Sequence, residues 1–255
     1  MAQSTIIETA LQAYPEKRRL IFIHVPKCAG TDLSINLRAK FPAALHQSLT
    51  SPDWFPPVAL DKALAKFKIA VDRSNAILVD GHNTLRWAIS ANVVRPTDRL
   101  FTIVRDPAAA LLSQINYVTS KMMADPLGKS PDVRQWLDRS SMNNVEGCQA
   151  ESVAAIASGL AHRNPMCNWL GAGNASSALA MIRQSNIEIT DTSRYKTWGE
   201  TTWGIPFVTQ HNASPRIVSA LPHGALEEYC AEDIVLHLEI MKAMGDELSI
   251  LGGAV

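Results

Sequence analysis

The sequence has no long apolar run, no surplus of charge and no cluster of cysteines. None of its apolar runs approaches the roughly 20 residues that a helix needs to cross a bilayer, and residues 1–19 hold no apolar core of signal-peptide length. Lys and Arg together number 24, and so do Asp and Glu, which argues against a general binder of nucleic acid or membrane surfaces. A local basic groove is compatible with this balance.

Cysteine is sparse and scattered. Cys28, Cys148, Cys167 and Cys230 form no CxxC pair and no Cys/His cluster with the spacing of a zinc site. We therefore expect reduced thiols and no required metal in a soluble, cytoplasmic protein. Internal repeats and low-complexity segments are also missing, and 255 residues suffice for one large core, so a single domain over residues 1–255 is predicted.

Short apolar runs alternate with stretches of helical pattern. Strands are predicted at residues 20–25, 76–80, 99–104 and 187–190. Helices are predicted at residues 6–14, 32–40, 58–67, 85–92, 107–123, 151–160, 165–170, 176–184 and 225–248. This alternation predicts an α/β fold, in which a central parallel sheet is covered by helices on both faces. The polar segment 140–150 is interpreted as a flap.

The turn after the first predicted strand has the features of an anion site. The apolar run breaks at Pro26, and a Gly30-Thr31 pair precedes the helix. A strand, a tight loop and a helix direct several backbone N–H groups and the positive end of the helix dipole at one place. Lys27 adds a positive charge and Thr31 a hydroxyl donor. The spacing differs from Gly-x4-Gly-Lys-Ser/Thr, and an ordinary strand-to-helix turn with a surface lysine is the alternative.

Three predicted strands end in polar functional groups, Lys27, His82 and Arg105. Ligands of parallel sheets bind at the carboxyl ends of the strands, so we expect these groups at one site. Arg105 precedes a helix start marked by Asp106 and Pro107. Ser113 lies about two turns further on, and an arginine fork with a hydroxyl suits a phosphate monoester. Alternatively, Arg105 pairs with a carboxylate and Ser113 is an ordinary surface serine.

His82 is the candidate general base. It follows the strand 76–80, and histidine is suited to removing a proton from an alcohol near neutral pH. A single histidine is more often structural, which is the alternative. His24 is the rival, but it lies within the first apolar strand and is expected to be buried and satisfied.

Residues 24–31, His-Val-Pro-Lys-Cys-Ala-Gly-Thr, resemble the 5′-phosphosulfate loop of the sulfotransferases. The likeness is closest to the carbohydrate O-sulfotransferases that resemble heparan sulfate 2-O-sulfotransferase. The step from Arg105 to Ser113 resembles the 3′-phosphate motif of that family, and Gly81-His82 stands where it carries its catalytic histidine. Residues 163–167 and 210–214 resemble two shorter family segments. Ala110 and Gln114 depart from the family, which often has arginine and tyrosine there.

The resemblance implies a P-loop-like three-layer fold and a single sulfotransferase-like domain. It also implies transfer of a sulfuryl group from 3′-phosphoadenosine 5′-phosphosulfate (PAPS), without a metal, to a hydroxyl of a saccharide or glycoconjugate. His82 and Lys27 would be catalytic. Many animal members carry a membrane anchor, so a bacterial, soluble version is expected. The residues implied in cofactor binding are Pro26, Lys27, Cys28, Ala29, Gly30, Thr31, Asp32, Arg105, Ser113, Asn212 and Ser214.

Two other functions are compatible with these residues. Residues 76–80 imitate the apolar run and aspartate of P-loop nucleotide kinases and phosphotransferases. A non-catalytic nucleotide-binding protein on the same fold is the second, since fold does not fix function. For the acceptor, Arg86 is a candidate contact with an acidic group. The tryptophans that are candidates to stack on sugar rings, or equally to pack in the core, are Trp54, Trp87, Trp198 and Trp203.

Overall fold

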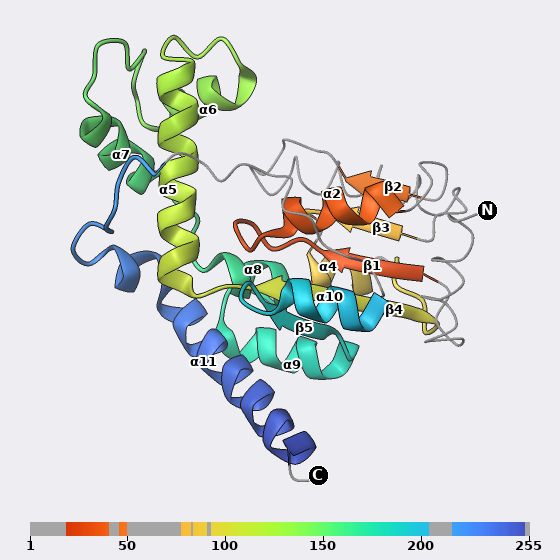
Figure 1. Cartoon of the computed structure of the whole chain (residues 1–255). Helices are drawn as coiled ribbons and strands as arrows, with labels where there is room; N and C mark the ends of the chain where they lie inside the picture. The colour runs from red at the N-terminus through yellow and green to blue at the C-terminus, as the bar shows by residue number, and fades with distance from the viewer. Residues whose placement is uncertain are drawn as a thin grey trace. The chain divides into compact units, whose positions relative to one another are not determined.

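The computed structural model describes residues 19–40, 46–49, 78–82, 84–90, 93–203 and 216–252. The chain divides into two compact units, each of which is considered by itself (Figure 1). The first unit comprises residues 1–105 and 166–211, and the second comprises residues 106–165 and 212–255. A single sulfotransferase-like domain over the whole chain stays a prediction.

The first unit contains a five-stranded sheet in the order β2-β3-β1-β4-β5, and every neighbouring pair is parallel. Its strands are β1 (Arg19–Ile23), β2 (His46–Leu49), β3 (Leu78–Gly81), β4 (Asp98–Val104) and β5 (Glu188–Asp191). Central β1 pairs with β3 on one side and β4 on the other. The chain thus fills one half of the sheet before it crosses to the other, and ligands of open parallel sheets bind beside such a crossover.

Strands β1, β3 and β4 form because all of their residues are buried, as expected for a sheet covered on both faces. All five residues of β1 and all seven of β4 are buried. Charged residues occur only where these strands begin: Arg19 Nε donates to Asp98 Oδ1 at 2.9 Å, and both side chains are buried. The pair fixes the register of β1 against β4 at the edge opposite the predicted site.

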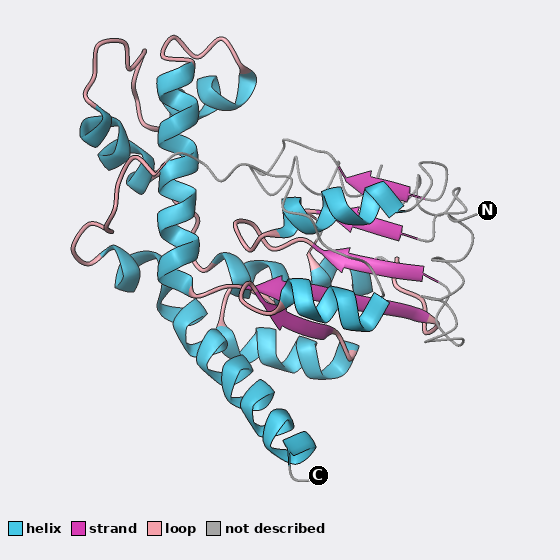
Figure 2. Ribbon diagram, in the orientation of Figure 1, coloured by secondary structure: helices cyan, strands magenta, loops and turns pink. Residues whose placement is uncertain are grey.

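Helices cover both faces of the sheet (Figure 2). They are α2 (Gly30–Lys40), α4 (Leu85–Ser90), α8 (Pro165–Leu170), α9 (Ala175–Ser185) and α10 (Tyr195–Trp203). In Figure 1, α2 and α10 lie in front of the sheet and α4 behind it. Trp198 of α10 packs on Phe101 of β4, with ring centroids 5.8 Å apart. The predicted α/β architecture of a parallel sheet between helices is therefore confirmed.

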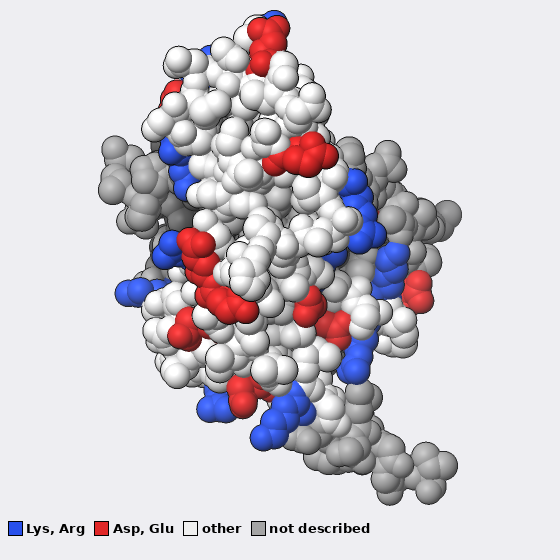
Figure 3. Space-filling view, turned by 90° about the vertical axis from the view of Figure 1, so that its left-hand side faces the viewer, with Lys and Arg blue, Asp and Glu red and all other residues white. Residues whose placement is uncertain are grey.

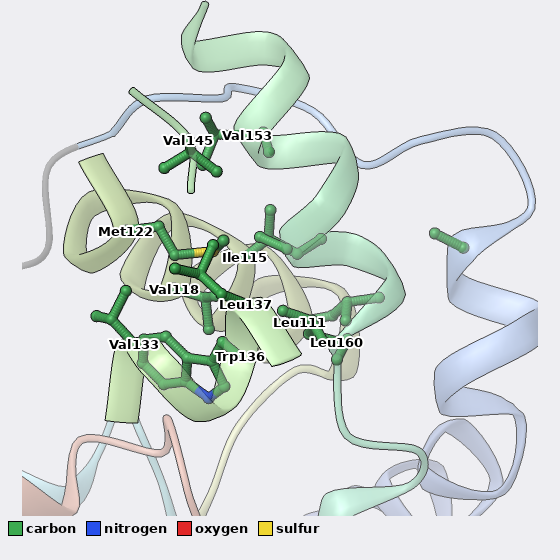
Figure 4. Close-up of a cluster of buried hydrophobic side chains, with 14 of the residues drawn as sticks. Leu111, Ile115, Val118, Met122, Val133, Trp136, Leu137, Val145, Val153 and Leu160 are labelled. Carbon is green, nitrogen blue, oxygen red and sulfur yellow. The ribbon is translucent and has the colours of Figure 1, made fainter. Parts of the chain in front are cut away.

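The second unit is helical, with α5 (Pro107–Ala124), α6 (Pro131–Arg139), α7 (Ala150–Gly159) and α11 (Ala225–Gly252). The predicted start of α5 is confirmed, because Asp106 Oδ1 accepts a hydrogen bond from the amide of Ala109 at 2.8 Å and Pro107 is the first helical residue. Figure 4 shows the core, in which α5, α6 and α7 meet. The labelled core residues are Leu111, Ile115, Val118, Met122, Val133, Trp136, Leu137, Val145, Val153 and Leu160.

The segment 140–150 is anchored in this core and does not have the character of a free flap. Val145 is buried among the core residues, and its amide donates to the carbonyl of Pro126 at 3.0 Å. The amide of Met142 donates to the carbonyl of Leu137 at 2.9 Å. Its polar sequence predicts a flap, but one apolar side chain and these backbone bonds hold the segment against the helical core.

The surface agrees with the balanced composition. Acidic and basic side chains both occur on the face shown in Figure 3, and neither sign covers it. Among the residues that the structure describes, no helix has the length and apolar character needed to cross a membrane.

Three elements were not predicted from sequence: β2, α6 and α10. The helices predicted at residues 6–14 and 58–67 lie outside the described residues.

Candidate functional site

Lys27, His82 and Arg105 follow the carboxyl ends of three neighbouring strands. Arg105 comes directly after β4, His82 directly after β3, and Lys27 four residues after β1. Since β3 and β4 both pair in parallel with β1, all three ends lie at the same edge of the sheet. Arg105 Nη1 donates to the backbone carbonyl of Lys27 at 3.1 Å, so the β4 end holds the loop that follows β1.

In the backbone of this loop, two left-handed residues are separated by one that is not left-handed. Lys27 has φ 62° and Ala29 has φ 58°, whereas Cys28 between them is not left-handed. Such alternation turns successive N–H groups toward one side and makes a concavity that binds anions. A left-handed residue other than glycine costs on the order of 1–3 kcal/mol, and such strain is concentrated at functional sites. The backbone therefore has the form expected of an anion-binding loop.

Helix α2 follows directly, and the loop side chains differ in exposure. The amide of Leu33 donates to the carbonyl of Ala29 at 3.1 Å, which starts the helix. The first N–H groups of a helix have no partner within it and favour an anion. Pro26 and Cys28 are buried, whereas Thr31 is exposed. The donors at this helix start are amides, a hydroxyl and an ammonium group, a set that fits a phosphate or sulfate.

Lys27 is a partly desolvated cation. Its pKa is lowered to about 8, chiefly because the ammonium group is buried and secondly because Arg105 is nearby; Cys28 acts in the opposite direction. At pH 7 the lysine is still mainly charged, and raising the pH through about 8 removes that charge.

His82 is neutral at pH 7. Its pKa is lowered to about 4, mainly by burial, and Lys27 acts in the same direction; the His24 carbonyl and Asp80 oppose the shift. Its Nδ1 lies 3.3 Å from the carbonyl oxygen of His24. Because a carbonyl only accepts hydrogen bonds, the proton of the neutral ring is on Nδ1 and the lone pair is on Nε2. His82 can therefore accept a proton at Nε2.

Asp80 acts electrostatically on this histidine. It is fully buried in β3, and its carboxylate forms an ion pair with Arg38 of α2, at 3.2 Å. The carboxylate opposes the lowering of the pKa of both His24 and His82. Asp80 therefore favours the protonated form of His82 while it remains paired with Arg38.

The side chain of Asp32 is directed into the protein. It is buried, and Tyr195 donates its phenolic proton to Asp32 Oδ2 at 2.5 Å. This bond joins α2 to α10 on one face of the sheet. Asp32 was predicted to bind the cofactor, but its carboxylate has this packing role, so any part in anion binding falls to its backbone N–H. Tyr195 was not predicted, since nothing in its local sequence indicates the contact.

The remaining predicted residues lie elsewhere. Ser113 is half-buried on α5 in the second unit, and its pairing with Arg105 stays a prediction. Asn212 and Ser214 lie outside the described residues. The two departures from the family, Ala110 and Gln114, are both buried in α5.

Gly30 is required by its contact with His24. A Cβ at Gly30 would lie 2.1 Å from His24 Cδ2, which is far inside van der Waals contact. We expect Gly30→Ala to lower the free energy of unfolding by about 1–3 kcal/mol through overpacking. Chemical denaturation followed by circular dichroism measures this. Gly159→Ala is the matched control, because a Cβ there meets no atom within 4 Å. Equal stability of the two variants would contradict the contact.

No group of three or more His, Cys, Asp or Glu side chains in the described part of the chain is placed to hold a metal. Comparison of the whole chain with known protein families, curated proteins and solved structures finds no match.

Proposed function

We propose that the protein is a sulfotransferase that uses PAPS to sulfate a hydroxyl of a saccharide or glycoconjugate. One observation carries the proposal: Lys27, His82 and Arg105 follow the carboxyl ends of three neighbouring parallel strands, and Lys27 lies in a loop with left-handed backbone at two residues. A loop or a histidine alone would be ordinary. Together they provide an anion site, a proton acceptor and a second cation at one edge of the sheet.

The donor set suits a cofactor that is phosphorylated at both ends. The loop amides, Thr31 and Lys27 would bind the 5′-phosphosulfate. Arg105 would bind the 3′-phosphate; a guanidinium has five N–H donors, and only one of them is needed for the observed bond to the Lys27 carbonyl. PAPS supplies the sulfuryl group and a phosphate as leaving group.

Each of these residues would have its own role in the transfer of the sulfuryl group. His82 Nε2 takes the proton of the acceptor hydroxyl while a new oxygen–sulfur bond forms and the bond from sulfur to the 5′-phosphate oxygen breaks. Lys27 stabilises the charge that develops on that bridging oxygen. Arg105, by binding the 3′-phosphate, fixes the position of the cofactor relative to Lys27 and His82. The sulfuryl group carries less charge than a terminal phosphoryl group, so a lysine and backbone amides suffice to neutralise it.

The competing function is a nucleotide phosphotransferase. The position of Asp80 near the end of β3, the strand paired with β1, favours it, since magnesium-dependent enzymes of that kind use an aspartate after an apolar strand. The ion pair of Asp80 with Arg38 and the position of the lysine before the glycine favour the sulfotransferase.

Calorimetric titration separates the two. We expect 3′-phosphoadenosine 5′-phosphate (PAP) to bind with a roughly micromolar dissociation constant and more tightly than ATP with magnesium. Loss of the charge-assisted bonds in Arg105→Ala should weaken PAP binding by about 10- to 100-fold. Arg95→Ala is the control, because Arg95 is exposed and precedes β4 at the other edge of the sheet. Preference for ATP with magnesium would move the phosphotransferase to first place.

The affinity for PAP is also expected to depend on pH. Since the pKa of Lys27 in the free protein is about 8, binding should weaken above that pH, by up to about tenfold per pH unit. The 3′-phosphate is already fully ionised there, because its second pKa is about 6. Calorimetry from pH 7 to 10 checks this, with Lys27→Arg as the variant whose charge persists. The same slope in both proteins would show that another group is responsible.

A further inference from the structure

The ring of His24 contacts both halves of the proposed site. It is buried and stacks on the His82 ring, with centroids 4.2 Å apart and planes inclined by 27°. It also stacks on Phe22, at 5.3 Å, and Phe22 stacks on Phe101, at 5.1 Å. A row of rings thus runs across one face of the sheet and ends at the candidate base. Stacking on His24 therefore restricts the position of the His82 ring.

The same ring supports the anion-binding loop. A Cβ on Gly30 would lie 2.1 Å from Cδ2 and 2.3 Å from Nε2 of His24, so the first residue of α2 rests against the edge of this ring. The N-terminal amides of α2 are among the proposed ligands of the 5′-phosphosulfate. The position of that helix start relative to His82 is therefore set through one side chain.

The backbone of His24 fixes the orientation of the His82 ring. Its carbonyl accepts the Nδ1 proton of His82 at 3.3 Å, and its amide donates to the carbonyl of Gly81 at 3.1 Å. The first bond chooses the tautomer and the second anchors the residue before the base. A ring that is stacked and bonded in this way has little freedom to rotate.

We propose that His24 is a positioning residue: its ring and backbone hold the His82 imidazole in one orientation, with the proton on Nδ1 and the lone pair on Nε2, beside the loop that carries Lys27. This rests on the proposed function in one respect, namely the role of His82 as base. His24 itself does not exchange the proton, because its ring is enclosed by Phe22, Gly30 and His82. The charged groups that surround the pair are Asp80 of β3, Arg38 of α2 and Lys27 of the loop.

A comparison of two variants separates positioning from packing. His24→Phe keeps an aromatic ring to stack on His82, whereas His24→Leu removes the ring and keeps the backbone carbonyl. Long-range proton–nitrogen correlation spectra of the imidazoles, assigned with His82→Asn, report the tautomer and titration of His82. In the wild type and in His24→Phe we expect the Nδ1–H tautomer and a ring that stays neutral well below pH 6. In His24→Leu the carbonyl remains, but without the stacked ring the His82 imidazole can turn away from it and toward solvent. We therefore expect mixed tautomers and a titration midpoint raised by at least one pH unit.

Turnover gives the second readout. Release of sulfate from PAPS, with water as acceptor, should show kcat lowered by about tenfold or more in His24→Leu through misplacement of the base. The KM for PAPS should change less than threefold, and His24→Phe should restore kcat to within about threefold of the wild type. A purely structural role would lower the folded fraction and leave the kcat of the folded protein unchanged.

The outcomes are distinguishable. A wild-type His82 protonated on Nε2, or a His24→Leu spectrum identical to that of the wild type, overturns the positioning role. If His24→Leu does not fold, the positioning role is still tested by the tautomer of His82 in the wild type and by the spectrum and kcat of His24→Phe. Absence of PAP binding and turnover in a protein with the expected spectra overturns the proposed function instead, and leaves the positioning of His82 by His24 supported.

Discussion

Lys27→Ala is expected to lower turnover by about 100- to 1000-fold, the effect typical of removing one donor that stabilises charge in a transition state. Lys27 has a left-handed backbone conformation, and its carbonyl accepts a hydrogen bond from Arg105. The backbone that carries the ammonium group is therefore held in place. Part of its hydration is already lost, which strengthens its attraction for a developing negative charge.

The measurement is the rate of sulfate release from PAPS, and then of transfer to acceptors found in a panel of saccharides. The affinity for PAP should fall less than kcat, because charge on the bridging oxygen develops in the transition state. Lys129→Ala is the control, since Lys129 is an exposed lysine of the second unit. If Lys27→Ala retains wild-type turnover, Lys27 has no part in the chemistry.

His82→Asn is expected to lower kcat by about 100- to 10,000-fold, the range for loss of a general base. Asparagine retains a polar group near the His24 carbonyl but has no nitrogen lone pair that accepts a proton at pH 7. The dissociation constant for PAP should stay within about threefold of the wild-type value, as expected for a group that contacts the acceptor and not the cofactor. His223→Asn, an exposed histidine of the second unit, is the control.

The wild-type rate should also fall as the pH is lowered through about 4, because His82 is then protonated and accepts no further proton. The free energy of unfolding is also expected to depend on pH, between about 4 and 6.5. The pKa of His82 is about 4 in the folded protein and 6.5 as its ordinary value, so the unfolded chain binds more protons between these values and folding weakens as the pH falls. Circular dichroism at each pH separates lost activity from lost structure. A rate that His82→Asn leaves unchanged would assign the proton transfer to another group.

Hydrophobic pattern alone located most of the elements. The runs that became β1, β3 and β4 are apolar because both faces of a parallel sheet are buried, and Asp106 with Pro107 marked the start of α5. Helix α6 also carried a signal, with Pro131 at its first position and Val133, Trp136 and Leu137 at helical spacing. The local sequence is therefore sufficient to indicate α6.

Other elements depend on partners distant in the chain. The residues of β2, His-Gln-Ser-Leu, show no apolar alternation, and the strand exists because its backbone pairs with β3. Helix α10 is mostly polar at the sequence level, and it is held by Tyr195 against Asp32 and by Trp198 against Phe101. Tertiary contacts overrode weak local preference in both cases.

For the candidate site, the sequence by itself determined which groups stand at strand ends: Lys27, His82 and Arg105. That follows from local pattern, because a buried strand must be apolar and the first polar residues after it mark its end. Only the tertiary structure decided that β3 and β4 flank β1, that Asp32 turns away to Tyr195, and that His24 lies against both Gly30 and His82. Strand order and ring packing are set by burial among residues far apart in the chain, and no local pattern records them.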